Sequence, residues 1–121
     1  MPRLLFFLFT LTLITLSCAY NSEESLYPEI SDCDSMNVTY TKNILPILED
    51  NCLSCHASIV ADDKGGHLSL EGYSNVADLS EAILASVNHV SGAKEMPKDA
   101  LKLDACLLRQ FGIWVETGKP E

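Results

Sequence analysis

Apolar residues recur at helical spacing in three segments between residues 39 and 118. The first segment spans 39–51, where Thr39 or Thr41 can serve as N-cap, and Pro46 lies either in the first turn or at a kink. Its apolar face consists of Ile44, Leu45, Ile47 and Leu48. This pattern predicts a first helix over 39–51.

Two further helices are predicted in the second half of the chain. Residues 74–88 carry an apolar stripe, although Ser80 could restart the helix and divide it into two short pieces. The last helix is expected to begin after Asp104, a good N-cap residue, and to end before Gly118. The two stripes consist of Val76, Leu79, Ile83, Leu84 and Val87, and of Leu107, Leu108, Phe111, Trp114 and Val115.

The segments between these helices have the composition of loops. Lys64-Gly65-Gly66 is a turn signal, residues 68–70 are expected to be extended or irregular, and residues 89–100 contain both Gly92 and Pro97. No stretch of alternating apolar and polar residues is long enough to predict a strand. The expected fold class is therefore a small all-α domain with long loops.

The N-terminus has the pattern of an export signal. Arg3 precedes an apolar run over 4–16, which is long enough for a signal peptide and short for a membrane span. The run ends at Ser17-Cys18, which is similar to the lipobox of bacterial lipoproteins. That resemblance implies a signal peptide over 1–17 and a lipid-anchored Cys18 on an envelope membrane. The alternative is an ordinary secretory signal that leaves a spare thiol.

The chain is acidic, with 17 Asp and Glu against 8 Lys and Arg and a formal net charge of −9. Loss of residues 1–17 would remove Arg3 and no acid, which takes the net charge to −10. Such a chain is a poor partner for nucleic acid and is attracted to basic partners, although the charge could serve solubility alone. Residues 18–37 are expected to form an acidic tether that precedes a domain over 38–121.

Cys52, Cys55 and His56 form a C-x-x-C-H cluster. A thioredoxin-like pair would need a βαβ context, and structural zinc would need a second pair of ligands; neither is visible. A plain disulfide would leave His56 unexplained. Covalent haem attachment uses all three residues: two thiols on one helical turn form thioethers, and the histidine after them reaches the iron.

A second axial ligand is expected downstream of the cluster. Met96 is the only methionine on that side, and Pro97 after it stiffens the loop. His67 and His89 are the alternatives, and a bis-His site would have a lower reduction potential. His89 could instead bind a haem propionate or lie at the surface, as His67 could.

Taken together, these motifs resemble the cytochrome c family, in particular its short monohaem planctomycete-type domain. The likeness covers about residues 38–119 and is carried by Ile44–Leu48, Cys52–His56, Gly65-Gly66, Met96-Pro97 and Leu103–Gly118. It implies three to five helices around one covalent haem c, with His56 and Met96 as axial ligands. In that fold the first and last helices cross, and Gly112 would permit their close approach. The alternative is that Gly112 is a tolerated helix glycine.

An extra pair of cysteines departs from this resemblance. Cys33 precedes the first helix and Cys106 lies in the last. If those helices touch, the two thiols can meet in a disulfide, which the export compartment permits.

The expected function is electron transfer to redox partner proteins, without enzymatic activity. The alternative is a haem-based ligand-binding or redox sensor whose sixth ligand is absent or displaceable. A haem-free disulfide module is the third hypothesis.

Overall fold

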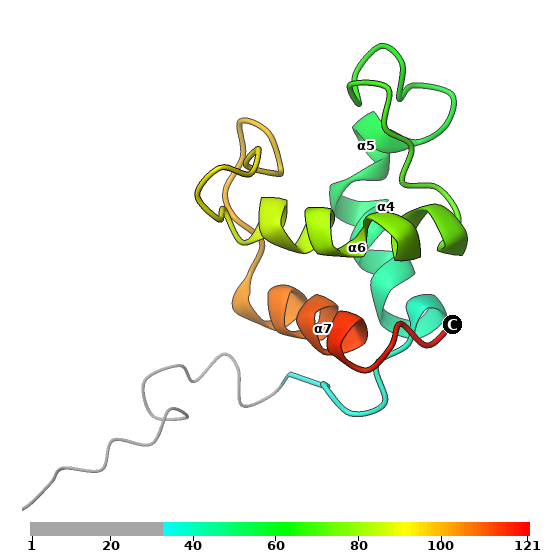
Figure 1. The fold of residues 1–121 in the computed structure, drawn as a ribbon, viewed down its shortest axis with the longest axis vertical. Helices are drawn as coiled ribbons and strands as arrows, with labels where there is room; N and C mark the ends of the chain where they lie inside the picture. The colour runs from blue at the N-terminus through cyan, green and yellow to red at the C-terminus, as the bar shows by residue number, and fades with distance from the viewer. Residues whose placement is uncertain (1–32) are drawn as a thin grey trace, which may run out of the picture. The chain divides into compact units, whose positions relative to one another are not determined.

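Helices account for all the regular secondary structure of residues 33–121, the part of the chain that the computed structural model describes (Figure 1). They follow in the order η1 (Tyr40–Ile44), α4 (Leu45–Asn51), α5 (Leu53–His56), α6 (Tyr73–Val87) and α7 (Ala105–Glu116). These residues contain no strand, so the all-α prediction is confirmed. The predicted signal segment 1–17 and the anchor Cys18 lie outside the described residues. None of the described helices is long and apolar enough to cross a membrane.

Pro46 divides the first helical segment. Because proline has no backbone N–H, it is tolerated in the first turn of a helix and not in the interior. The chain accordingly forms one π-helical turn, η1, and then begins α4 with Pro46 in its first turn. Thr39 caps η1, since its side chain accepts a hydrogen bond from the backbone N–H of Lys42. The predicted cap is confirmed, whereas the expected single helix is two joined elements.

The middle helix, α6, is continuous, so Ser80 does not divide it into two pieces. Ser80 is fully buried, and its hydroxyl donates to the Ala77 carbonyl at 2.9 Å. This bond gives the buried hydroxyl a partner within its own helix, so the hydroxyl is not left unsatisfied. The apolar stripe therefore continues through Ser80 from Val76 to Val87.

Both predicted ends of α7 are confirmed. The Asp104 side chain accepts a hydrogen bond from the Leu107 N–H at 3.0 Å, as an N-cap does. At the other end Gly118 has φ +89°, and its N–H donates to the Val115 carbonyl. The N–H of Lys119 donates to the Trp114 carbonyl at 2.8 Å. These two bonds form a Schellman motif with glycine at its left-handed position.

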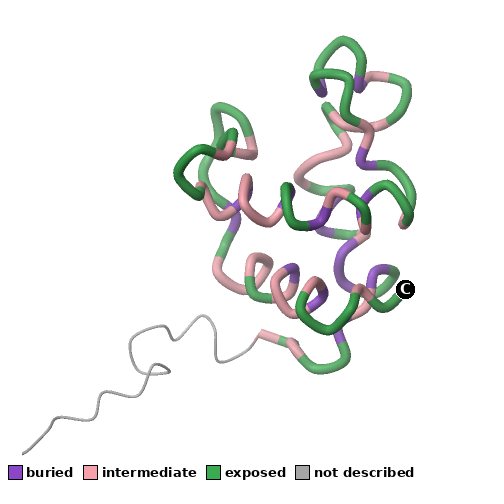
Figure 2. The backbone as a smooth tube through the Cα atoms, viewed as in Figure 1, coloured by how far each residue is buried: buried purple, intermediate pink, exposed green. Residues whose placement is uncertain are grey.

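The hydrophobic core is centred on Trp114, and the buried positions run through every long helix (Figure 2). Trp114 is fully buried, and its ring lies against those of Phe111, Tyr40 and Tyr73. Its indole N–H donates to the Pro120 carbonyl at 2.9 Å, which holds the C-terminal tail against the core. Trp114 is thus a core aromatic, as expected.

Gly112 does not have the expected role in helix packing. α7 packs against η1 and α6, so the two ends of the described chain do meet. A Cβ atom built on Gly112 would nevertheless meet no other atom within 4 Å. The close approach expected at Gly112 is therefore wrong, because the contacts of α7 are made by its larger side chains.

Cys33 and Cys106 form a disulfide in the structure, with Cα atoms 5.4 Å apart. The bond joins the segment before η1 to the first turn of α7. Beside it, the Gln110 amide donates to the Asp34 carbonyl at 2.7 Å. The start of the described chain is thereby fixed to the last helix.

Removal of this disulfide should destabilise the domain. The bond closes a loop of 73 residues, for which the chain-entropy account gives about 4 kcal/mol. The double variant Cys33→Ser and Cys106→Ser should therefore have a free energy of unfolding lower by roughly 2–4 kcal/mol, measured by denaturant titration. Equal stability of the variant and the oxidised wild type would contradict this expectation.

Candidate functional site

The C-x-x-C-H cluster lies on a single short helical turn, α5 (Figure 1). Cys52 ends α4 and begins α5 with non-helical backbone angles, so the chain changes direction there. Its carbonyl accepts hydrogen bonds from the N–H groups of Cys55 at 3.1 Å and His56 at 2.9 Å. Both thiols and the imidazole therefore extend from one turn of backbone.

The two thiols of this turn are free and differ in environment. Cys55 is exposed, whereas Cys52 is half-buried and packs against the hydrophobic core. Burial disfavours the thiolate and raises the pKa of the Cys52 thiol to about 11. Cys52 is thus protonated at neutral pH, and neither thiol is used in a disulfide.

The imidazole of His56 is held by a backbone hydrogen bond. Its Nδ1 atom lies 2.8 Å from the Leu68 carbonyl oxygen. A carbonyl oxygen only accepts, so Nδ1 carries the proton and the neutral ring keeps its lone pair on Nε2. The Leu70 N–H donates to the His56 carbonyl at 2.9 Å, which fastens the same two segments a second time.

Gly65 permits this arrangement of His56. A Cβ atom at this position would lie 2.6 Å from the Cys55 carbonyl oxygen and 3.0 Å from Nδ1 of His56. Any side chain here would push the loop away from α5. The sequence marks Gly65 only as part of a turn; its contact with α5 depends on a fold-back that local sequence does not reveal.

The carboxylate of Glu71 also holds the loop that follows α5. Glu71 accepts hydrogen bonds from the backbone N–H of Ser58, at 2.9 Å, and from its hydroxyl. These hydrogen bonds favour the ionised form and hold the pKa of Glu71 below its usual range. The segment after His56 and the segment before α6 are thus tied by side chain as well as backbone. Sequence reasoning missed this pair, since the two residues are thirteen positions apart.

Met96 lies in the loop between α6 and α7, residues 88–104, called here the Met96 loop. Its side chain is half-buried and packs against the hydrophobic core, which Cys52 also borders. Its N–H donates to the Ser86 carbonyl at 3.2 Å, and its own carbonyl oxygen lies 3.1 Å from Nε2 of His89. The backbone of Met96 is therefore held on both sides.

The other two histidines occupy different environments. Nε2 of His89 bonds to the Met96 carbonyl and must carry the proton, because its partner only accepts. His67 pairs with Asp62 through Nδ1 at 3.2 Å, and both side chains are more than four-fifths exposed. His89 is half-buried, whereas His67 is exposed.

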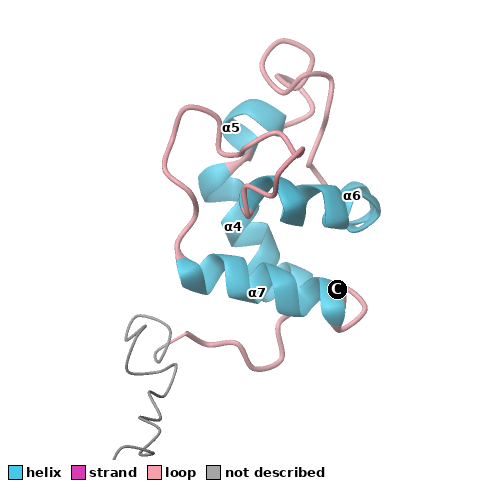
Figure 3. Ribbon diagram, turned by 60° about the vertical axis from the view of Figure 1, so that its left-hand side comes forward, coloured by secondary structure: helices cyan, strands magenta, loops and turns pink. Residues whose placement is uncertain are grey.

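The structure brings Cys52, Cys55 and His56 onto one turn and puts Met96 on a separate loop. In Figures 1 and 3, α5 and the Met96 loop lie on the same side of α7. Within residues 33–121, no three His, Cys, Asp or Glu side chains come together as a group able to hold a metal ion.

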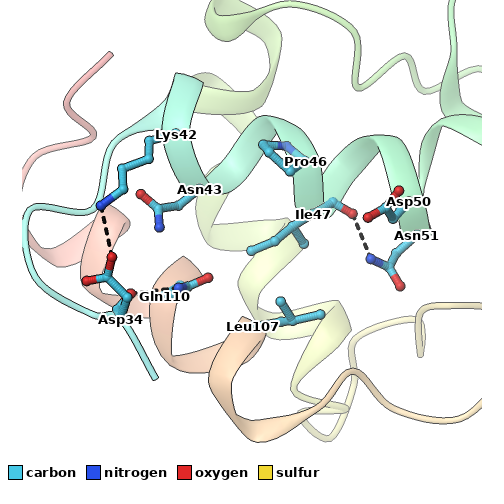
Figure 4. Close-up of a pocket in the computed structure, with 9 residues that line it drawn as sticks. All are labelled: Asp34, Lys42, Asn43, Pro46, Ile47, Asp50, Asn51, Leu107 and Gln110. Atoms are coloured by element: carbon cyan, nitrogen blue, oxygen red, sulfur yellow. Dashed lines mark hydrogen bonds and ion pairs between the residues drawn. The ribbon is translucent and has the colours of Figure 1, made fainter. Parts of the chain in front are cut away.

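A shallow cavity of about 290 Å³ lies between the η1–α4 segment and α7 (Figure 4). Its walls contain polar groups that already bond within the protein: Lys42 to Asp34 at 2.9 Å, and the Asn51 amide to the Ile47 carbonyl. Its lining consists of Asp34, Lys42, Asn43, Pro46, Ile47, Asp50, Asn51, Leu107 and Gln110. No residue of α5 and no residue of the Met96 loop lines it, so it is separate from the candidate site.

Gly65→Ala should disturb α5 directly. The new Cβ cannot fit 2.6 Å from a backbone carbonyl, so the loop or the His56 ring must move. We expect the free energy of unfolding to fall by roughly 1–3 kcal/mol, measured by denaturant titration.

Gly112→Ala is the matched control, because the same added methyl group meets no atom within 4 Å. In the interior of α7 this change should raise the free energy of unfolding by about 0.5–1 kcal/mol. Equal effects of the two substitutions would contradict the close contact at Gly65.

The hydrogen bonds to Glu71 predict that its contribution to the stability of the domain depends on pH. The pKa of Glu71 is lowered from its ordinary 4.5, so its stabilising contribution is complete above pH 4.5 and is lost as the pH falls through the lowered value. The stability difference between the wild type and Glu71→Gln should therefore be largest at neutral pH and shrink in acid. Glu81→Gln, at an exposed position of α6, controls for the loss of one charge. A difference that stays constant from pH 7 to acid would contradict the prediction.

The chain matches no known family model, no curated protein and no solved structure. Its function must therefore be argued from its own residues. Among those residues, α5 presents two thiols and a histidine on one turn, and the Leu68 carbonyl holds the histidine.

Proposed function

We propose that this chain is a monohaem c-type cytochrome, anchored by lipid at Cys18 to a bacterial envelope membrane, which transfers electrons between redox partners. The observation that carries the proposal is the hydrogen bond from Nδ1 of His56 to the Leu68 carbonyl, on the turn that also presents two free thiols. When bound, the haem supplies the one-electron couple of its iron.

His56 is prepared to act as a metal ligand. Histidine ligands usually donate their second ring N–H to a carbonyl or carboxylate, which fixes the tautomer and the ring orientation. Here the Leu68 carbonyl accepts that bond, and Nε2 keeps the lone pair that would bind iron. The proximity of Gly65 restricts the ring further.

Cys52 and Cys55 supply the covalent attachment. Each thiol would form one thioether to a vinyl group, and both extend from the single turn that carries His56. Because Cys52 is half-buried against the core, its thioether would lie on the apolar side of the attachment. Cys55, which is exposed, would form the outer one.

Met96 is the best candidate for the second axial ligand. It borders the same core as Cys52, and its backbone is held by Ser86 and His89. Nε2 of His89 is engaged by the Met96 carbonyl, and His67 is exposed beside Asp62. A thioether ligand gives the iron a higher reduction potential than a second imidazole does. The partly buried position of Met96 would also raise this potential.

The chain's charge bears on its partners. With a net charge of −10 once residues 1–17 are removed, it would be steered toward redox proteins with a basic face and away from nucleic acid. No enzymatic role is proposed, because both axial positions are assigned to side chains of the protein.

Met96→Ala tests the proposal when the domain is produced with a c-haem maturation system. The oxidised and reduced absorption spectra of the wild type should be those of low-spin covalent haem, with the sulfur-to-iron charge-transfer band. The variant should lose that band, and its reduced form should bind carbon monoxide that the wild type excludes.

The other outcomes separate the rival functions. An unchanged spectrum in Met96→Ala would mean that His67 or His89 binds the iron or that the site is open. Carbon monoxide binding by the wild type would favour a sensor with an open or displaceable site. A wild type without covalent haem would leave only the haem-free disulfide module.

A further inference from the structure

We infer that His89 is a positioning residue that holds Met96 in place through a hydrogen bond from its Nε2–H to the Met96 carbonyl. The inference rests on the proposed function, since it concerns the residue assigned there as the sixth ligand. This role differs from all three expectations from sequence, which were iron ligation in place of Met96, propionate binding and a surface position.

The backbone geometry of His89 is the first observation. His89 follows the C-cap of α6 and has φ +56°, in the left-handed region. Its N–H donates to the Ser86 carbonyl at 3.2 Å, and the N–H of Val90 donates to the Ala85 carbonyl at 3.0 Å. These two bonds form a Schellman motif, so His89 occupies the position where glycine is most favourable.

α7 ends in the same motif and has the favoured residue. There Gly118 takes the left-handed position with φ +89°, as described above. The chain therefore uses glycine at one C-terminal motif and histidine at the other, where a side chain carries a steric cost. The His89 side chain makes a contact there that glycine could not make.

That contact is with the backbone of Met96. Nε2 of His89 lies 3.1 Å from the Met96 carbonyl oxygen, seven residues along the chain. The Ser86 carbonyl accepts hydrogen bonds from the N–H groups of both His89 and Met96, each at 3.2 Å. The end of α6 thus holds Met96 on both sides, through Ser86 at its N–H and through His89 at its carbonyl.

The consequence concerns the strength of Met96 as a ligand. A thioether binds iron weakly, so small exogenous ligands compete with it, and their apparent affinity reports how firmly the loop presents Met96. Loss of one hydrogen bond that holds the loop should raise this affinity by up to roughly tenfold.

Two substitutions at residue 89 separate the side-chain contact from the backbone geometry. His89→Gln keeps an N–H donor of similar reach but gains no backbone advantage at positive φ. His89→Asn suits the left-handed position but is too short to reach Met96. His67→Asn is the matched control, because His67 also has positive φ, +64°, and is exposed with its partner Asp62.

The experiment titrates cyanide into the oxidised holoprotein of each variant and follows the loss of the sulfur-to-iron band. His89→Asn should bind cyanide up to roughly tenfold more tightly than the wild type, and His89→Gln and His67→Asn should stay within about twofold of it. If only the backbone mattered, the order would reverse: His89→Asn would match the wild type and His89→Gln would show the increase. That order, or no change in either variant, overturns the inference.

The wild-type spectrum distinguishes failure of the proposed function from failure of the role of His89. A wild type that lacks the sulfur-to-iron band has no Met96 ligand to position, and both proposals then fail before any His89 variant is compared. A wild type with the band and cyanide affinities that do not depend on residue 89 would overturn the role of His89 alone.

Discussion

The fold-back of residues 57–70 onto α5 is the constraint on which the candidate site depends. It joins the Leu68 carbonyl to Nδ1 of His56 and the Leu70 N–H to the His56 carbonyl. Through these bonds the main chain fixes the tautomer of His56 and leaves Nε2 as the atom with a lone pair. Gly65 makes the fold-back possible because it has no Cβ to meet the Cys55 carbonyl. Without this contact nothing in the described structure would fix the orientation of the His56 ring beside the two thiols.

The hydrophobic core and the disulfide hold together the helices on which α5 rests. The core around Trp114 joins η1, α6 and α7, and the disulfide fixes the segment before η1 to α7. Cys52 and Met96 border this same core from α5 and from the Met96 loop. A domain of this size has a modest core, so a covalent group between its helices would contribute to stability as well as to chemistry.

The sequence predicts the helices well where the signal is local. Asp104 and Gly118 have the expected capping roles because a cap depends on its immediate neighbours. The break that Ser80 could introduce is absent, and the serine is buried in the helix with its hydroxyl bonded to the Ala77 carbonyl. The roles of Gly65, Glu71 and His89 could not be predicted, since each depends on a partner brought close only by the fold. Backbone carbonyls such as that of Leu68 carry no signature in the sequence at all.

The most direct test of the central claim is the intact mass of the domain under denaturing conditions. The domain would be produced with a c-haem maturation system, beside a variant with Cys52→Ala and Cys55→Ala. Our account predicts that the wild type gains the mass of one haem, retained after denaturation, and that the variant gains none. A colourless wild type with the mass of the bare chain would contradict it.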